Sequence, residues 1–252
     1  MILDLAPGLV EAGALAFARV GALSMLLPGL GERSIPARQR LLLALALAVM
    51  ALPAVRDGLA SQPKSPILHQ LVAEAAVGLA IGACGRLTLA AMETAGAIVA
   101  QSIGLSFAQV VDPGQGQQGE ILSTFLRLTG VALIFAADLH HLAIAGVLAS
   151  YAALPPGAGP PAGDIAELFV RLLGETFRAG VGIAAPFLVF GFVFNLGLGL
   201  AAKLTPQLQL FFLAIPLSVG LGLAALALAL PGAARRFLDL AASILAAILP
   251  AM

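Results

Sequence analysis

Eight apolar segments follow one another along this chain, and they leave little room for any fold other than a set of helices. The segments cover approximately residues 9–27, 41–55, 68–92, 121–137, 142–154, 181–202, 208–230 and 237–249. Backbone N–H and C=O groups without a partner are costly in an apolar setting, so each segment is expected to satisfy its own groups as a helix. The sequence therefore predicts an all-α protein built of hydrophobic helical hairpins.

The composition places the chain in the membrane class. Of its 252 residues 60% are hydrophobic and 10% are charged, the mean hydropathy is +1.04 and the net charge is zero. A neutral chain has no electrostatic attraction for nucleic acid or for an acidic ligand, so neither is expected as a partner. The single cysteine, Cys84, cannot form a disulfide or a thiolate metal site within one chain. The N-terminal stretch lacks the basic residues of a cleaved signal peptide.

Several segments are poorly suited to cross lipid alone. A helix needs about 20 apolar residues to span the hydrocarbon core, and segments 41–55 and 142–154 are shorter. Others contain ionisable side chains, which cost about 2.5 to 3.5 kcal/mol each at the bilayer centre, namely Glu11, Arg19, Glu74, Arg86 and Arg127. These side chains are expected to face protein partners or a wet cavity, and other proteins are expected to cover much of the chain. A short, tilted bundle in lipid is the alternative.

Four prolines interrupt the apolar segments in the last third of the chain. Pro186, Pro206, Pro216 and Pro231 each remove a backbone donor, so each is expected to kink or end its helix. Broken helices are tolerated where protein or a water-filled cavity covers the break. The predicted helix hinges are three of these prolines, Pro186, Pro206 and Pro216, together with Asn195.

The segment from 101 to 119, QSIGLSFAQVVDPGQGQQG, is polar and rich in glycine in an otherwise apolar chain. It holds five of the ten glutamines, four glycines and one charged side chain. Amide side chains and glycines do not build a packed core, but they make a pliable, uncharged loop that can line or block a passage. This segment is the predicted working part of the chain. The alternative is a long surface loop between two helices.

Two proline-rich stretches, 56–66 and 154–164, are predicted connections. The second separates a longer N-terminal part from a pair of long C-terminal helices, predicted at about 165–202 and 207–249 with a hinge at 203–206. This stretch is the predicted boundary within the chain.

Charges alternate in sign near the start of the first C-terminal helix. Glu167, Arg171, Glu175 and Arg178 are spaced by four, four and three residues, so they can form a ladder of ion pairs. Exposed pairs of this kind contribute less than about 1 kcal/mol each. A solvated face is therefore favoured over a role in docking a partner.

The stretch ADLHHLA joins a carboxylate, Asp138, to the imidazoles of His140 and His141. Adjacent histidines on a helix point about 100° apart, and no further ligand follows. Helix capping or interhelical hydrogen bonding is therefore favoured, and no metal site is predicted. The chain also lacks a nucleophile elbow, an HExxH motif, a P-loop and a dinucleotide fingerprint, so it is not expected to be an enzyme.

Four stretches of the sequence are individually unusual and occur in a recognisable order. They are GERSIPARQR at 31–40, SIGLSFAQVVDP at 102–113, DLHHLAIAGVLASYAALPPG at 138–157 and FNLGLGLAAKLTPQLQLFFLAIPL at 194–217. Over nearly the whole chain the sequence resembles the FliR family of type III secretion export-gate proteins. The GLSFA and DP residues favour the flagellar branch over the injectisome branch. The clearest departures are the Gln/Gly-rich residues 114–119 and the proline-rich connection.

The resemblance implies an assembly and a location. The chain would be one copy in a helical oligomeric assembly with FliP- and FliQ-like subunits and other export-apparatus subunits, in the bacterial inner membrane and the flagellar basal body. The family looks like a fusion of those two partners. Residues 1–161 would then be the FliP-like part and residues 162–252 the FliQ-like hairpin, in agreement with the boundary above. The resemblance implies no cofactor.

The resemblance also implies a mechanism, the passive gating of a channel through which unfolded flagellar proteins pass. The family's loop between the third and fourth apolar regions projects into the central pore and corresponds here to residues 104–119. Phe107, Val110 and Val111 would act as an apolar stopper, and an uncharged plug of this kind excludes ions. The complete set assigned to the plug is Gly104, Leu105, Ser106, Phe107, Val110, Val111, Asp112, Pro113, Gly114, Gly116 and Gly119.

Three alternative functions stay open. The first is an injectisome homologue of the same gate. The second is a secondary transporter of a small solute, which would open broken helices near Pro186, Asn195 and Pro206, but the internal symmetry expected of it is not apparent in the sequence. The third is a purely structural membrane subunit, in which changes to the loop would leave permeability unaltered.

Overall fold

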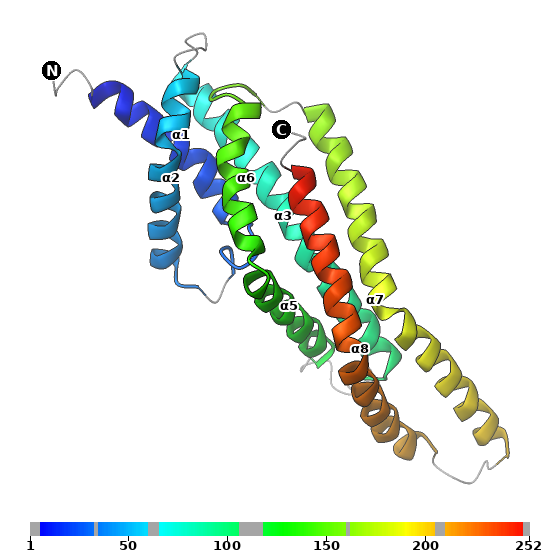
Figure 1. Ribbon diagram of the computed structural model, residues 1–252. Helices are drawn as coiled ribbons and strands as arrows, with labels where there is room; N and C mark the ends of the chain where they lie inside the picture. The colour runs from blue at the N-terminus through cyan, green and yellow to red at the C-terminus, as the bar shows by residue number, and fades with distance from the viewer. Residues whose placement is uncertain are drawn as a thin grey trace. The chain divides into compact units, whose positions relative to one another are not determined.

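The computed structural model confirms the predicted all-α class (Figure 1). It describes residues 6–32, 35–59, 66–105, 118–159, 162–204 and 210–248, and these residues form seven helices and no strand. The helices are α1 (Ala6–Ser24), α2 (Ala37–Leu59), α3 (Ile67–Ser102), α5 (Gln118–Ala136), α6 (Leu139–Ala153), α7 (Ala162–Leu204) and α8 (Leu210–Ile248). The predicted pair of long C-terminal helices is present as α7 and α8, of 43 and 39 residues.

Four of the described helices are long and apolar enough to cross a membrane: α2, α3, α7 and α8. The expectation that segment 41–55 is too short to span is wrong, because α2 continues past Arg40 and Arg56 to a length of 23 residues. α6 has 15 residues and is too short by itself, as predicted. α5 and α6 together form a possible fifth span, with a bend of 75° at the break between them. By length and composition, the chain is a membrane protein.

The prolines within the described helices do not end them. α7 continues through Pro186, and α8 continues through both Pro216 and Pro231. Pro206 lies outside the described residues. Each proline was expected to kink or end its helix; the ending is wrong for these three positions, and the kink stays a prediction. A helix tolerates an internal proline when another donor satisfies the backbone carbonyl that proline leaves unpaired.

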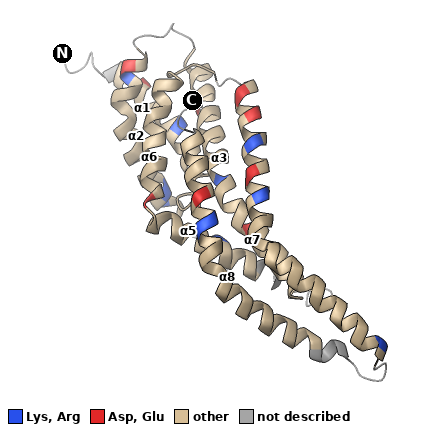
Figure 2. Ribbon diagram, turned by 45° about the vertical axis from the view of Figure 1, so that its right-hand side comes forward, with Lys and Arg blue, Asp and Glu red and all other residues tan. Residues whose placement is uncertain are grey.

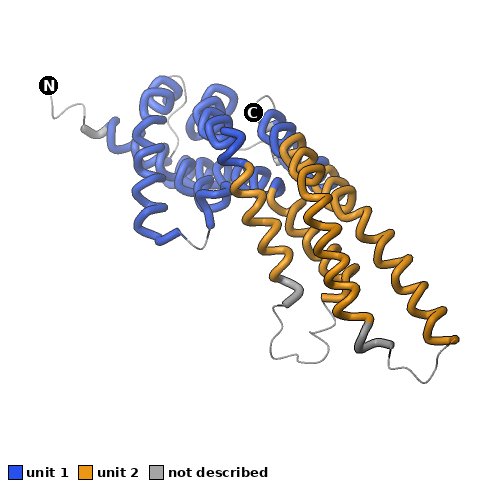
Figure 3. The backbone as a smooth tube through the Cα atoms, turned by 60° about the horizontal axis from the view of Figure 1, so that its bottom comes forward, with its two compact units in different colours: residues 1–88, 134–174, 241–252 blue, residues 89–133, 175–240 orange. Residues whose placement is uncertain are grey.

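Two compact units can be distinguished within the chain (Figure 3). Unit 1 comprises residues 1–88, 134–174 and 241–252, and unit 2 comprises residues 89–133 and 175–240. Each unit takes residues from both sides of position 161. The two units are defined by which residues pack together within the chain. The predicted division into a FliP-like part and a FliQ-like hairpin is instead defined by resemblance to other proteins, and it stays a prediction.

In unit 1, α1 packs against α2 and, through a row of glycines, against α3. Gly78 faces the backbone carbonyl of Arg19, and a β-carbon at this position would overlap with it. A β-carbon at Gly82 would lie 2.9 Å from the carbonyl oxygen of Leu23 and 2.9 Å from the β-carbon of Leu26. Glycines four residues apart lie on one face of a helix and let two helix backbones approach closely. This glycine seam fixes α3 against α1.

A buried ion pair joins three parts of unit 1. Arg19 of α1 and Glu74 of α3 are both fully buried, and Nε and Nη2 of the arginine donate to the two carboxylate oxygens at 2.8 and 2.9 Å. The other donors of Arg19 reach the carbonyl and hydroxyl oxygens of Ser150 at 3.1 and 3.2 Å and the carbonyl of Leu154 at 2.9 Å. Glu74 also accepts a bond from the backbone N–H of Gly157 at 3.0 Å.

This arrangement satisfies all five N–H donors of the Arg19 guanidinium. Its positive charge lies at the C-terminal end of α6, where a cation is favoured by the helix dipole. The guanidinium carbon also lies 4.1 Å from the centre of the Tyr151 ring, close enough for a cation–π interaction. Arg19 and Glu74 were expected to face protein partners or a wet cavity, but they are buried against each other within the chain itself.

Candidate functional site

The predicted pore loop begins where α3 ends, and a glycine defines this end. Gly104 has a φ of +85°, in the left-handed region that favours glycine. Its N–H donates to the carbonyl of Gln101 at 3.3 Å, and the N–H of Leu105 donates to the carbonyl of Ala100 at 3.0 Å. These two bonds form a Schellman motif, which ends a helix by satisfying its last carbonyls. Gly104 therefore fixes the point at which the chain leaves α3.

In unit 2 the C-terminal helix pair holds this end of α3. Ile103 is fully buried, and a β-carbon at Gly222 of α8 would overlap with its side chain. A β-carbon at Gly191 of α7 would lie 2.8 Å from the carbonyl oxygen of Ser102. Both contacts require glycine because a larger residue would force the helices apart. Residues 101–105, termed the loop base below, are therefore held by α7 and α8.

On the other side of the predicted loop, α5 crosses α3 at close range. A β-carbon at Gly96 would lie 2.5 Å from the Cα of Ser123.

Nε of Arg127 lies 3.5 Å from Oε1 of Glu93, and these side chains are 27% and 44% exposed. Arg127 was expected to face protein partners or a wet cavity, and it lies at an open cleft. Residues that line the cleft include Glu93, Thr94, Ser123, Thr124 and Arg127.

Only part of the predicted plug falls within the described residues. Gly104 and Leu105 belong to the loop base, and Gly119 lies in the first turn of α5. Ser106, Phe107, Val110, Val111, Asp112, Pro113, Gly114 and Gly116 lie outside the described residues. The assignment of this set as a plug stays a prediction, and the described part defines where it would start.

Pro186, one of the predicted hinges, has a neighbour that replaces its missing N–H. A residue at position 186 would normally donate to the carbonyl of Gly182, four residues earlier. Nη1 of Arg236, on α8, donates to this carbonyl at 2.7 Å instead. The sequence carries only a weak signal for this role, a pair of arginines in an apolar stretch. Arg236 therefore ties α8 to α7 at the proline.

Replacing Arg236 with methionine should lower the free energy of unfolding by about 1 kcal/mol, because the Gly182 carbonyl loses its donor. In the Pro186→Ala background the N–H of residue 186 becomes available to that carbonyl, so the same replacement should cost much less. A double-mutant cycle of unfolding in detergent measures this coupling. Equal losses in the two backgrounds would show that Arg236 acts through a different contact.

Asn195 lies one helical turn after Gly191, the glycine of α7 that contacts Ser102. Its side-chain amide donates to the carbonyl of Gly191 at 2.7 Å. A side chain that bonds to the carbonyl four residues earlier competes with the helical ladder and often bends the helix. Pro216 lies within α8. The hinge roles of Pro186, Asn195, Pro206 and Pro216 stay predictions.

Acidic and basic residues alternate along the first part of α7 (Figure 2). Glu167, Arg171 and Arg178 are exposed and Glu175 is half-buried. Among the described residues, no two of these four form an ion pair. Their exposure agrees with the favoured interpretation as a solvated face, but the ladder of ion pairs is not formed.

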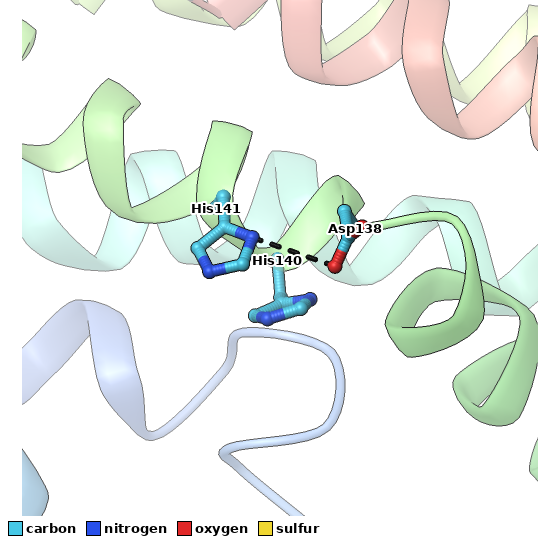
Figure 4. A group of neighbouring side chains, drawn as sticks. All are labelled: Asp138, His140 and His141. Carbon is cyan, nitrogen blue, oxygen red and sulfur yellow. Dashed lines mark ion pairs between the residues drawn. The ribbon is translucent and has the colours of Figure 1, made fainter.

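Asp138, His140 and His141 come together at the start of α6 (Figure 4). Oδ1 of Asp138 lies 3.6 Å from Nδ1 of His141, and the two side chains are 78% and 71% exposed. Asp138 occupies the N-cap position of α6, but its side chain makes no capping hydrogen bond. The predicted capping role is therefore wrong for Asp138. Its φ of +56° is left-handed, which is costly for a residue other than glycine.

Comparison with known proteins now assigns the chain to a family. Residues 10–244 match the family described as bacterial export proteins, family 1. The chain belongs to this family. The flagellar biosynthetic protein FliR of Caulobacter vibrioides is 41% identical over 236 residues, which are 91% of this chain and 92% of that protein. The Escherichia coli protein of the same name is 30% identical over 214 residues, 84% of this chain and 82% of that protein.

A more distant relative has a different name. The Yop proteins translocation protein T of Yersinia pestis is 27% identical over 146 residues, 57% of this chain and 56% of that protein. The Caulobacter vibrioides and Escherichia coli proteins therefore match a larger share of the chain at higher identity than the Yersinia pestis protein does. These similarities confirm the resemblance to the FliR family and support a role in a type III export apparatus.

Proposed function

We propose that this chain is a subunit of the flagellar type III protein export gate, in the bacterial inner membrane at the flagellar basal body. It forms a protein-conducting channel with FliP- and FliQ-like subunits, helps to seal the closed pore and nucleates their assembly. Unfolded flagellar proteins are the cargo, and other components of the apparatus drive their passage. The observation that carries the proposal is the match to the bacterial export family over residues 10–244, together with the 41% identity to a FliR protein.

The loop base supports the sealing role. A plug needs a firm attachment at one end, because a stopper with a loose anchor would not close the pore at a defined position. The Schellman motif at Gly104 and the contacts of Ile103 with Gly222 provide such an attachment. The residues that would follow, from Ser106 to Gly116, are uncharged except for Asp112. An uncharged plug offers ions no solvation and binds a passing polypeptide weakly.

The apolar surface of α7 supports the partner assignment. Large contiguous apolar patches on a protein surface mark contacts with other proteins or with lipid. Several large apolar side chains of α7 are more than half exposed, namely Val189, Phe192, Val193, Leu196 and Leu200. In the proposed assembly FliP- and FliQ-like subunits cover this surface. The material purified when this chain is expressed with both partners should therefore have a larger native mass than the material purified when the chain is expressed without them.

Deleting residues 109–118 should leave assembly with FliP- and FliQ-like partners intact and make the closed complex leak ions. The reason is that the deletion removes the body of the proposed plug but leaves the loop base and its contacts with α7 and α8 in place. Native mass reports assembly, and the conductance of planar bilayers that contain the complex reports the leak. An assembled complex that conducts no better than the native one would contradict the sealing role.

Two length-preserving variants separate the stopper from the rest of the loop. Replacing Phe107, Val110 and Val111 together with serine should also open the closed complex to ions, because water enters a polar constriction more readily than an apolar one. The matched control replaces Gln115 and Gln117 with alanine in the same segment and should keep the seal. Leakage in the control as well would assign the seal to the loop as a whole.

A further inference from the structure

We propose that Asp138, His140 and His141 form a binding site for a divalent transition-metal ion of the Zn²⁺ class. The site is independent of the proposed plug. The sequence argued against it because adjacent histidines point apart, but one carboxylate oxygen and one nitrogen from each ring lie within 4.8 Å of one another. Imidazole nitrogen and carboxylate oxygen are preferred ligands of Zn²⁺ and of related first-row cations.

The separation of Asp138 and His141 suits a shared ion better than a direct bond. Their nearest oxygen and nitrogen are 3.6 Å apart, which is too long for a hydrogen bond. When a tetrahedral ion binds each ligand atom at about 2.0 to 2.1 Å, any two of its ligand atoms are roughly 3.3 Å apart. A movement of a few tenths of an ångström, which side chains 78% and 71% exposed can make, would bring both onto one ion.

His140 supplies the third ligand. Its Nδ1 is buried and has no hydrogen-bond partner in the described part of the chain. A buried polar atom without a partner calls for an explanation, and a neutral imidazole has one nitrogen with a free electron pair. The ring is packed, with its centre 5.0 Å from that of Phe135 and 4.0 Å from that of His141. Two imidazoles and a carboxylate are thus available on one side of the start of α6.

The position of the cluster also points to a ligand. It lies at the break between α5 and α6, two helices that together form one possible bent membrane span. Ionisable side chains inside such a span are costly and mark functional sites. The carboxylate of Asp138 does not cap α6 and makes its closest ionic approach to His141. With three protein ligands, a fourth position on the ion is left for water or for a side chain of another subunit.

The test uses the full chain, purified in detergent after removal of metals. Titration with Co²⁺, followed by its visible absorption, and with Zn²⁺, followed by calorimetry, should show saturable binding of one ion per chain. Asp138→Asn and His141→Ala should each weaken binding by about tenfold or more. The matched control is His69→Ala, which removes the remaining histidine of the chain, an exposed residue of α3, and should leave binding unchanged.

Asp138→Asn also guards against a loss of binding that results from misfolding. Asparagine tolerates left-handed backbone better than other residues with a side chain, so this variant should unfold at nearly the native temperature. Loss of binding in a folded Asp138→Asn protein supports the site. An absence of saturable binding in the native chain, or equal affinity in the native, Asp138→Asn and His141→Ala proteins, would overturn it.

Discussion

Replacing Arg19 with methionine is expected to lower the free energy of unfolding by about 3 to 5 kcal/mol. Methionine fills part of the space of the arginine but leaves the carboxylate of Glu74 buried without its cation. The variant also removes the donors that satisfy the carbonyls of Ser150 and Leu154 near the end of α6. Unfolding of the purified chain in detergent, followed by its helical circular dichroism, measures the loss.

A second replacement and a surface control show whether the buried charge is responsible. Combining Arg19→Met with Glu74→Leu removes the unpaired charge, so the double variant should recover most of the lost stability. Arg38→Met removes a charge from an exposed position on α2 and should change stability by less than about 0.5 kcal/mol. If the double variant is as unstable as Arg19→Met alone, the loss comes from the hydrogen bonds to α6 and not from the stranded carboxylate.

Replacing Gly78 with alanine is expected to lower the free energy of unfolding by about 1 to 3 kcal/mol. The new methyl group would meet the backbone carbonyl of Arg19, which belongs to a helix and cannot turn aside as the tip of a flexible side chain does. α1 and α3 would have to separate, and the adjacent contact of Gly82 with Leu23 would loosen with them. The same unfolding measurement applies.

Gly174→Ala is the matched control for this variant. Gly174 lies inside α7, and no atom comes within 4 Å of a β-carbon built there. Alanine in an open helical position should stabilise by about 0.5 to 1 kcal/mol, because it has less backbone freedom to lose on folding. The two substitutions are chemically identical and should have opposite signs. A stabilising Gly78→Ala would show that the glycine seam is not closely packed.

Much of the fold follows from the apolar pattern, because a helix is the local way to satisfy backbone groups in an apolar setting. The pattern predicted the helical class and the C-terminal pair, but it misjudged helix ends. Arg40 and Arg56 look like boundaries of an apolar segment, yet α2 includes both. Long basic side chains can lie along a helix and carry their charge toward water, so an arginine does not by itself stop a helix. The length of α2 could not be predicted from hydrophobicity alone.

The prolines of α7 and α8 do not end their helices, and the reason is different. The rule that proline ends a helix rests on the carbonyl left without a donor and on the clash of the proline ring with that carbonyl. Arg236 supplies that donor to Gly182 from a position 54 residues away in the sequence. A rule that considers only neighbouring residues in the sequence cannot predict this contact, because Arg236 comes close to Gly182 only when α7 and α8 pack together.

Of the candidate site, only its start can be compared with the sequence. Gly104 fits a helix-ending role, as a glycine at the start of a polar segment indicates, and the assignment of the residues after Leu105 as a plug stays a prediction. The roles of Gly191 and Gly222 could not be predicted, because a glycine in an apolar helix is compatible with close packing, with flexibility or with neither. Only the positions of Ser102 and Ile103 against them decide the matter.

The ion pair of α1 also constrains how the chain is made. Arg19 emerges early in synthesis, but Glu74 follows 55 residues later and Leu154, the last acceptor, 135 residues later. At roughly 5 to 20 residues per second, translation would leave the guanidinium without its last acceptor for on the order of ten seconds. Until these acceptors are synthesised, the nascent first helix is expected to stay in water, at the lipid headgroup layer or bound to an insertion factor. It can pack in its buried position only afterwards.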